Sequence, residues 1–433
     1  MLLHQDGEVL PLFIFDKNIL NTLEKDDKRV YFIFQAVLKL KSDLQKMGLD
    51  LALFYSTPEE VFTYLKSQDF HDVYASVDYD SYAIQRDASI SKIMTFHPLN
   101  DTYIFDTNEI LKSDFSPYLV FTPYYKAGKQ LYTKFHALYY TKGDNIAVPF
   151  TYNSIMELKN NHLKPLHVEL QSIGFTPLHV EVISPTQKLQ ALREKLKNYA
   201  LERDFLCLDA TSNLSVDLRF GTISIRAILR ELITLKKEGL DTEPFFRQLI
   251  FRDFYAYLLF HFPTLEWKNY KYETPTSVNE DLYERFCNAK TGYPLIDAAV
   301  SELKTTGKMH NRARMVVGSF FTKYLLLPWQ KGEAFFAKYL LDYDKASNVL
   351  SWQWCAGTGI DPQPYFRIFN PYSQSKKFDK EALYIKKWLP LLKDILAKNL
   401  HDETFLYEHT IEGYPKPIVK HEEARKKFLA LFA

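Results

Sequence analysis

The spacing of apolar residues changes once along this chain of 433 residues, and the change limits the folds that the chain can adopt. From Val9 to roughly Tyr125, short apolar runs alternate with helical patterns such as Val30–Met47. This alternation is typical of a parallel α/β sheet, whose strands are joined by helices. The segment Thr57–Glu60 has the residues of a capping box and indicates the start of one such helix. The expected strands are Val9–Phe15, Leu51–Tyr55, Val73–Val77 and Tyr103–Phe105.

Beyond Thr186 strand patterns nearly vanish and helical patterns dominate. Ile225, Ile228, Leu229 and Leu232 form one apolar stripe of a helix that Gly239 is placed to end. Between Lys126 and Pro185, several prolines and the lack of a sustained period indicate an irregular connector. We therefore expect an α/β domain over residues 1–125, a connector over 126–185 and an all-α domain over 186–433.

Composition and charge exclude several classes of protein. No apolar run is long enough to cross a bilayer, and Met1–Glu8 lacks a signal pattern, which predicts a soluble cytoplasmic protein. The three cysteines fall in no metal-ligand spacing, and their odd number argues against a disulfide framework, so no metal site is expected. The net charge of +1 gives no general attraction for nucleic acid. Positive potential would have to come from local clusters such as Arg312 and Arg314.

Four motifs of the C-terminal half make the sequence recognisable: Thr291–Asp297, Met309–Met315, Ser351–Trp354 and Pro364–Pro371. In order and spacing they resemble the FAD-binding domain of the photolyase/cryptochrome family, and the closest match is to the class I cyclobutane pyrimidine dimer photolyases. The resemblance implies a Rossmann-like N-terminal domain and a larger all-α domain that binds FAD.

Two further segments extend the resemblance upstream. Tyr199–Asp204 and Thr211–Ser215 resemble the family's upstream flavin segment, so the match covers nearly all of residues 195–433. The N-terminal half matches more loosely, through Val73–Asp87 and Phe121–Pro123. Without the family, hydroxyls at the start of a helix indicate either a pyrophosphate site or ordinary capping. The flavin contacts implied by the resemblance are Tyr199, Thr211, Ser212, Asn213, Leu214, Ser215, Arg252, Asn311, Arg314, Asp342, Asp344 and Asn348.

The motif Met309–Met315 divides its side chains between two faces of a helix. Asn311, Arg314 and Met315 stand three and four residues apart and share one face, while Arg312 points elsewhere. A solvated basic helix surface is the alternative. By resemblance, the first face serves flavin, with Met315 bordering the lesion pocket, and Arg312 faces DNA phosphates.

The resemblance also assigns roles to Asp342, Asp344 and Asn348. The first carboxylate pairs with Arg314, the second approaches the flavin ring or ribose, and the asparagine lies near flavin N5. Photolyase-like members carry Asn at this last position, whereas plant cryptochromes carry Asp there. Asn348 therefore favours a fully reduced, repair-competent flavin.

Tryptophans form a second set of matched positions. Trp352 and Trp329 match the first two members of the family's electron-transfer chain from the surface to the flavin. Thr276 stands where the third tryptophan belongs, so the outer hop is lost or is taken by a tyrosine such as Tyr272. As structural residues, two buried tryptophans alone would carry little weight.

The lesion pocket implied by the resemblance departs from the bacterial pattern. Trp354 matches the residue that stacks on the flipped dimer, whereas Gln248 replaces a glutamate and Phe251 replaces a tryptophan. An amide can still hydrogen-bond a base, and a phenyl ring can still stack. The predicted DNA contacts are Gln248, Phe251, Arg252, Arg312, Met315 and Trp354. The predicted catalytic residues are Trp352, Trp329, Asn348 and Gln248.

These matches predict a monomeric photolyase that uses light and reduced FAD to split cyclobutane pyrimidine dimers in DNA. A cryptochrome-like blue-light sensor without repair activity is the alternative. Family members open with a strand that precedes the segment matched by Met1–Asp16. We therefore expect a sheet without its inner strand, through a misassigned start or a degenerate antenna domain. Ala83 replaces a glutamate that holds a folate in some members, so the sequence assigns no second chromophore.

Overall fold

The computed structural model describes residues 9–132, 136, 169–178, 180, 183–274 and 278–432. The chain divides into two compact units. One unit comprises Met1–Asp106, Leu131–Gln187 and Asp217–Thr234, and the other comprises Thr107–Gln130, Lys188–Val216 and Leu235–Ala433. The domain boundary expected at residue 125 falls inside helix α5 (Phe121–Leu131). Among the described residues, no helix is both long enough and apolar enough to span a bilayer.

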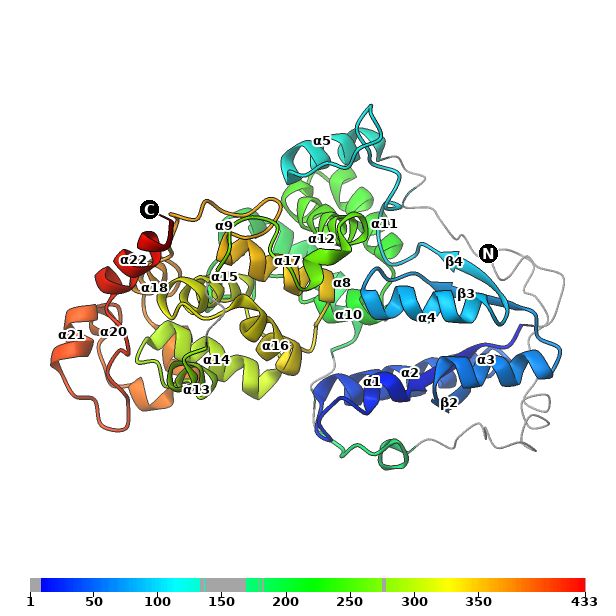
Figure 1. Cartoon of the computed structure of the whole chain (residues 1–433), viewed down its shortest axis with the longest axis horizontal. Coiled ribbons are helices and arrows are strands. Elements are labelled where there is room, and N and C mark those ends of the chain that lie inside the picture. Colours follow the sequence, from blue (N-terminus) through cyan, green and yellow to red (C-terminus); the bar gives the residue numbers. More distant parts are fainter. Residues whose placement is uncertain are drawn as a thin grey trace. The chain divides into compact units, whose positions relative to one another are not determined.

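The strands of the first unit form two parallel pairs. β1 (Leu12–Asp16) pairs with β2 (Ala52–Ser56), and β3 (Asp72–Ser76) pairs with β4 (Thr95–Leu99). Among the described residues, no ladder joins the two pairs. The α/β class is confirmed, and the sheet expected to lack its inner strand consists of two separate ribbons, seen in Figure 1 as β3 and β4 apart from β2.

The strand expected at Tyr103–Phe105 is wrong. These residues are at most 3% exposed, but they form a bend. The buried guanidinium of Arg226 donates hydrogen bonds to the carbonyl oxygens of Tyr103, at 2.7 Å, and Asn100, at 3.2 Å. A side chain therefore satisfies backbone groups there. The fourth strand is Thr95–Leu99, which the sequence concealed because Pro98 cannot donate to a ladder.

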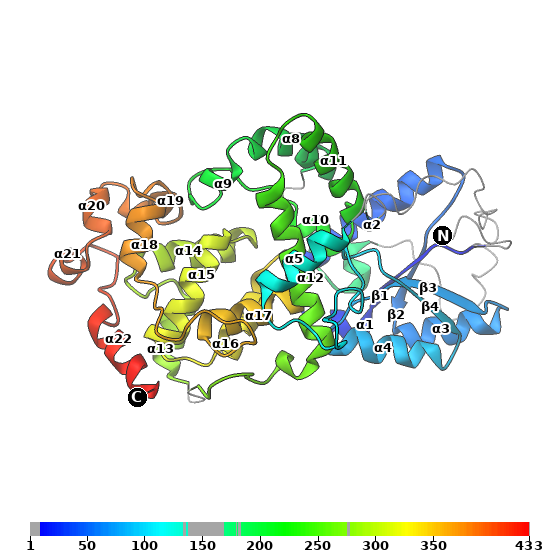
Figure 2. The ribbon, with the colours of Figure 1, turned by 90° about the horizontal axis from the view of Figure 1, so that it is seen from above.

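Side chains alternate between the two faces of the ribbon β1–β2. Phe15 and Leu53 pack with the residues of α2 (Lys28–Lys46), whereas Phe54 packs with those of α3 (Pro58–Ser67). This period of two explains why the strands are apolar almost throughout, since both faces are covered. Figure 2 shows α2 and α3 on opposite sides of β1 and β2. The predicted capping box is confirmed: Thr57 Oγ1 accepts from the Glu60 N–H, and Glu60 Oε2 accepts from the Thr57 N–H.

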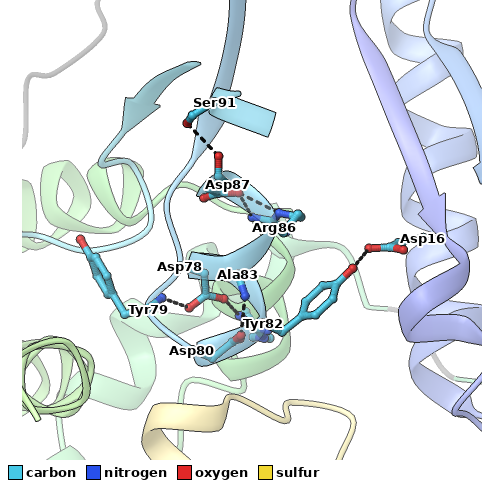
Figure 3. A network of polar contacts seen from close by, with 10 residues as sticks. Asp16, Asp78, Tyr79, Asp80, Tyr82, Ala83, Arg86, Asp87 and Ser91 are labelled. Carbon is cyan, nitrogen blue, oxygen red and sulfur yellow. Dashed lines mark hydrogen bonds and ion pairs between the residues drawn. The ribbon is translucent and has the colours of Figure 1, made fainter. Parts of the chain in front are cut away.

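Polar contacts connect the end of β1 with the start of α4 (Ser81–Ser91) (Figure 3). The Tyr82 hydroxyl donates to the Asp16 carboxylate. Burial and this carboxylate raise the pKa of Tyr82 to about 12, so the phenol stays a neutral donor. The backbone N–H of Ala83 donates to Asp80, which caps α4, over 2.8 Å. Ala83 is 3% exposed and contributes only a methyl group.

The described part of the second unit is built from helices. There, a π-helical turn, η5 (Phe320–Tyr324), directly follows α15 (Asn311–Ser319). The predicted stripe on α11 (Ile225–Lys237), a helix that lies mostly in the first unit, is confirmed, because Ile225, Ile228, Leu229 and Leu232 are at most 4% exposed. Counting both units, the other described α-helices are α1 (Lys17–Leu20), α8 (Pro185–Leu196), α9 (Tyr199–Glu202), α10 (Ser215–Phe220), α12 (Glu243–His261), α13 (Glu280–Cys287), α14 (Pro294–Thr306), α16 (Trp329–Tyr339), α17 (Lys345–Ala356), α18 (Pro371–Phe378), α19 (Leu383–Trp388), α20 (Ala397–Leu400), α21 (Glu403–Glu408) and α22 (His421–Leu429).

The motif Thr291–Asp297 is organised by one buried carboxylate. Asp297 accepts hydrogen bonds from the Thr291 N–H (2.9 Å), the Thr291 hydroxyl (2.7 Å), the Gly292 N–H (3.0 Å) and the Tyr414 hydroxyl (2.7 Å). Burial raises the pKa of Asp297 to about 6, and the four hydrogen bonds oppose that rise. The carboxylate therefore fixes the turn before α14 and ties a distant segment to it.

Gly292 allows that distant segment to approach closely. Its φ of +74° is a left-handed conformation, and an added Cβ would lie 2.4 Å from the backbone of Lys416. The Ile418 N–H donates to the Thr291 carbonyl over 2.9 Å, and the Tyr293 hydroxyl donates to the Val419 carbonyl over 2.6 Å. Only glycine fits this crowded backbone crossing.

We expect Asp297→Asn to lower the free energy of unfolding by about 2–3 kcal/mol, because the amide turns one acceptor into a donor that faces other donors. Tyr414→Phe removes only one of the four donors and should cost about 1 kcal/mol. Urea unfolding at pH 7 checks both values. Equal denaturation midpoints for Asp297→Asn and the wild type would contradict this account.

The raised pKa of Asp297 also predicts a pH dependence. Between the ordinary value of 3.8 and about 6, the folded state binds more protons at this group than the unfolded state does. The stability contributed by Asp297 therefore falls as the pH rises through that window. The difference in stability between the wild type and Asp297→Asn should be larger at pH 4 than at pH 7.

Candidate functional site

Helix α15 presents the predicted face. Asn311 is exposed, and Arg314 and Met315 are partly exposed, so all three remain accessible. The other side of the helix packs into the core through residues that are fully buried: Ala313, Val316 and Val317. The predicted sharing of one face is confirmed. This face offers an amide, a guanidinium and a thioether to a ligand.

The expected ion pair between Arg314 and Asp342 is also confirmed. Arg314 Nη2 lies 2.9 and 2.8 Å from the two carboxylate oxygens of Asp342. Arg314 Nε donates to the Met309 carbonyl over 2.8 Å. The Asp342 side chain is 9% exposed and that of Arg314 is 29% exposed. Three hydrogen bonds therefore fix the guanidinium while leaving part of it open to a ligand.

Asp344 and Asn348 lie four residues apart at the start of α17. The Asp344 carboxylate caps the helix by accepting from the Ser347 N–H over 2.8 Å. Asn348 Nδ2 donates to the carbonyl oxygen and to Oε1 of Glu333, at 3.1 and 3.0 Å. The amide nitrogen is thus committed to α16. Its carbonyl oxygen is the group that Asn348 can offer to a ligand.

Trp352 lies one turn beyond Asn348 and is 2% exposed. Phe321 and Phe336 pack edge-on against its ring, with centroids 5.4 and 4.9 Å away. Its indole N–H is buried and has no hydrogen-bond partner within the described ranges. Leaving such a donor unsatisfied costs about 1–3 kcal/mol. The residues here thus fit a polar aromatic group that supplies an acceptor beside the ring.

Trp329 begins α16 and is 1% exposed. Its indole N–H donates to Asn269 Oδ1 over 2.7 Å, and Asn269 Nδ2 donates to the Tyr272 carbonyl over 3.0 Å. Asn269 therefore connects the buried tryptophan to the half-exposed Tyr272. Thr276 lies outside the described residues, so the outer hop of the electron route stays a prediction.

A hollow brings together Phe251 from α12 and Trp354 from α17. The hollow is small and partly open to solvent. Phe121 on α5 contacts Phe251, with ring centroids 4.2 Å apart. The lining residues are Phe251, Phe254, Tyr255, Leu258, Leu350, Trp354, Gly359, Ile360 and Asp361. The two predicted stacking residues do share one hollow.

Gln248 and Met315, expected in the same wall, do not line this hollow. Gln248 Nε2 donates to the Pro244 carbonyl one turn earlier in α12, over 3.4 Å. Met315 is on α15, where its sulfur lies 3.8 Å from Asn311 Nδ2. The roles predicted for both residues in lesion binding stay predictions.

The two arginines predicted at DNA phosphates differ in their surroundings. Arg312 Nη2 lies 2.7 Å from Asp204 Oδ2, and its guanidinium stacks 4.3 Å from the Phe378 ring centroid. Its side chain is 17% exposed, so it is largely engaged within the protein. Arg252 is partly exposed on α12. Their phosphate contacts remain predictions.

The segment Thr211–Ser215 forms a tight turn before α10. The Leu214 N–H donates to Ser212 Oγ over 3.4 Å, and the Thr211 hydroxyl donates to Asn213 Oδ1 over 3.2 Å. Asn213 adopts a φ of +56°, and Ser215 is exposed. Tyr199 is buried edge-on against Phe245, and burial raises its pKa. These contacts fit a structured turn, and the flavin contacts predicted here stay untested.

Sequence reasoning missed several residues of the site. Glu333 holds Asn348, Asn269 holds Trp329, and Phe121 supports Phe251. Gly332 was a signal of this packing, because a glycine inside a helical pattern costs about 1 kcal/mol relative to alanine and is kept where packing requires it. An added Cβ at Gly332 would lie 2.3 Å from the Trp352 ring.

Comparison with known proteins identifies similar chains. A family model described as "FAD binding domain of DNA photolyase" matches residues 245–433, and one described as "DNA photolyase" matches residues 3–141. A deoxyribodipyrimidine photo-lyase from Alkalihalophilus pseudofirmus is 32% identical over 93% of this chain and 87% of its own length. A class III photolyase structure from Agrobacterium tumefaciens has a TM-score of 0.82 and 28% identity, over 98% of this chain and 92% of that one. A cryptochrome structure from Synechocystis, 22% identical with a TM-score of 0.83 over 98% of this chain and 93% of that one, is similar in fold alone.

We expect Gly332→Ala to destabilise the protein by about 1–3 kcal/mol, the usual cost of overpacking. Alanine normally stabilises a helix interior by about 1 kcal/mol relative to glycine, but here its Cβ collides with the Trp352 ring. In a Trp352→Phe background the smaller ring should relieve most of the cost. Urea unfolding of the four proteins in this cycle measures the coupling. A stabilising effect of Gly332→Ala in the wild type would contradict the contact.

Proposed function

Because this chain belongs to the photolyase/cryptochrome family and carries its FAD-binding domain, we propose that it is a deoxyribodipyrimidine photo-lyase that splits cyclobutane pyrimidine dimers under blue light. One observation carries the proposal. Helix α17 presents Asn348 and Trp352 toward α16 and presents Trp354 to the hollow that also contains Phe251. Trp352 and Trp354 are two residues apart, which is about 200° around a helix, so one rigid element serves two adjoining sites.

The residues of the first site fit FAD. When bound in its reduced form, FAD supplies the electron that light drives onto the dimer. Arg314 offers a cation held by Asp342, Asn348 offers a carbonyl oxygen, and the Trp352 indole N–H lacks an acceptor within the described residues. We propose that the cofactor contacts are completed by Tyr199, Thr211, Ser212, Asn213, Leu214, Ser215, Arg252, Asn311 and Asp344.

The second site suits a base removed from the DNA stack. Trp354 and Phe251 offer aromatic faces, and stacking on such rings is worth roughly 1–3 kcal/mol per base. A damaged, weakly stacked dimer costs the least to flip out of the duplex, which provides selectivity. We propose that Arg252 and Arg312 contact phosphates. We also propose that Gln248 hydrogen-bonds the lesion, which requires its amide to turn away from the Pro244 carbonyl. Arg312 would need to exchange Asp204 for a phosphate or to share its guanidinium between them.

We expect Arg314→Ala to lose bound FAD. The change leaves Asp342 without its partner and should cost roughly 2–3 kcal/mol of stability, less than for a fully buried pair because the arginine is partly exposed. Adding Asp342→Asn should restore stability without restoring the cofactor. Flavin absorbance per protein and urea unfolding provide the two measurements. Stoichiometric FAD in the folded single variant would refute the assigned role of Arg314.

Trp354→Ala should weaken binding of dimer-containing DNA by about 1–3 kcal/mol and binding of intact DNA by less, because it removes stacking on the flipped base. Trp267→Ala is the control, since Trp267 is exposed and does not line the hollow. Titrations of both DNAs at two salt concentrations measure the effects, with phosphate contacts visible as the salt dependence.

The enzymatic proposal itself is tested by illuminating the FAD-loaded, reduced protein with dimer-containing DNA. Loss of dimers under blue light supports it, and the same protein kept in the dark is the control. Dimers left intact in both single- and double-stranded DNA would overturn it and favour a light sensor.

A further inference from the structure

We propose that Lys323 is a positioning residue that fixes the loop Pro364–Asn370 for contact with damaged DNA. This inference rests on the function proposed above and adds a binding element to it. The loop joins the hollow-lining segment Gly359–Asp361 to helix α18. Lys323 lies behind the loop, in the π-helical turn η5. Such turns inside helices often accompany functional sites.

Lys323 is fully buried, at 0% exposure. Its Nζ donates hydrogen bonds to the carbonyl oxygens of Tyr365, at 3.1 Å, and Arg367, at 2.9 Å. In the described part of the chain, no carboxylate pairs with it. Burying an unpaired ammonium is costly, so its hydrogen bonds must offset much of that cost. Both bonds go to the backbone of one loop, and the lysine therefore acts on the conformation of that loop.

The two ends of the loop are held from the same side of the core. The Phe369 N–H donates to Ser319 Oγ over 3.3 Å, and Ser319 directly precedes the π-helical turn. At the other end, Gln363 Nε2 donates to the Cys355 carbonyl over 2.9 Å. The Phe369 ring lies 6.5 Å from the ring of Trp354, which lines the hollow. Lys323 holds the middle of the loop between these anchors.

The outer side of the loop presents two exposed side chains of the kind that bind unstacked nucleic acid. Phe366 is 61% exposed, and Arg367 is also exposed. An aromatic ring beside a guanidinium suits a base and its phosphate. A loop held rigidly before binding loses less conformational entropy when DNA arrives. Lys323 therefore increases affinity for DNA without touching it.

The charge of Lys323 is sensitive to pH in the accessible range. Burial lowers its pKa to about 8; the Cys355 thiol on α17 opposes this shift, and the Arg367 guanidinium on the loop adds to it. From α22, the ring of Phe428 faces Nζ at 5.4 Å. Above pH 8 the amine becomes neutral and donates weaker hydrogen bonds to the two carbonyls.

The test compares Lys323→Met, Phe366→Ala and their combination in the full-length, FAD-loaded protein. We expect each single variant to bind dimer-containing DNA about tenfold more weakly, with unchanged FAD content. The double variant should be little weaker than either single one, because both act through one loop. Wild-type affinity in both single variants would overturn the proposal.

A second measurement needs no variant. In the wild type, hydrogen-exchange rates of backbone amides are measured at pH 7 and at pH 9. The rates of the loop amides should rise by a larger factor than those of other amides of the second unit that exchange in the same kinetic regime. An increase equal to the general one would overturn the role of Lys323 even if Lys323→Met failed to fold. The two proposals fail differently. If the wild type neither prefers nor repairs dimers, the enzymatic function is refuted. If the wild type repairs dimers and the variants are unaffected, only the positioning role of Lys323 is refuted.

Discussion

The close approach of α16 and α17 at Gly332 is the contact on which the rest of the site depends. Because residue 332 has no side chain, the Trp352 ring lies against the backbone of α16. The same approach brings Glu333 within hydrogen-bond distance of Asn348. With one side of α17 fixed in this way, Trp354 on the other side is directed to the hollow. The contact between α16 and α17 therefore sets the relative geometry of the two proposed binding sites.

Local features of this fold could be predicted from the sequence because their causes are local. The capping box at Thr57 and the shared face of Asn311 and Arg314 depend only on residues within one turn of helix. The pairing of Arg314 with Asp342, 28 residues apart, came from resemblance to a known family. Spacing alone contains no information about a partner at that distance.

Features that depend on packing between elements were missed. Tyr103–Phe105 has the apolar character of a strand, but its backbone is satisfied by Arg226 from more than a hundred residues away. Asn269 accepts the hydrogen bond of Trp329, and Phe121 packs against Phe251, only because segments distant in the sequence fold against each other. The hollow was half predicted, since Phe251 and Trp354 line it while Gln248 turns back to its own helix. Side-chain direction on a surface helix is decided by neighbours that the sequence does not reveal.

The hydrogen bond between Asp297 and Tyr414 has a consequence for the order of events during synthesis. The two residues are 117 positions apart, and the bond cannot form until the second has left the ribosome. At common rates of translation the ribosome adds Tyr414 roughly 6 to 23 seconds after Asp297, and Tyr414 emerges from the ribosome later still. During that interval Asp297, in the turn before α14, lacks one of its four hydrogen-bond donors. The backbone segment at Lys416, which lies against Gly292, is also missing. The turn before α14 therefore completes its hydrogen bonds only after 117 further residues have been added.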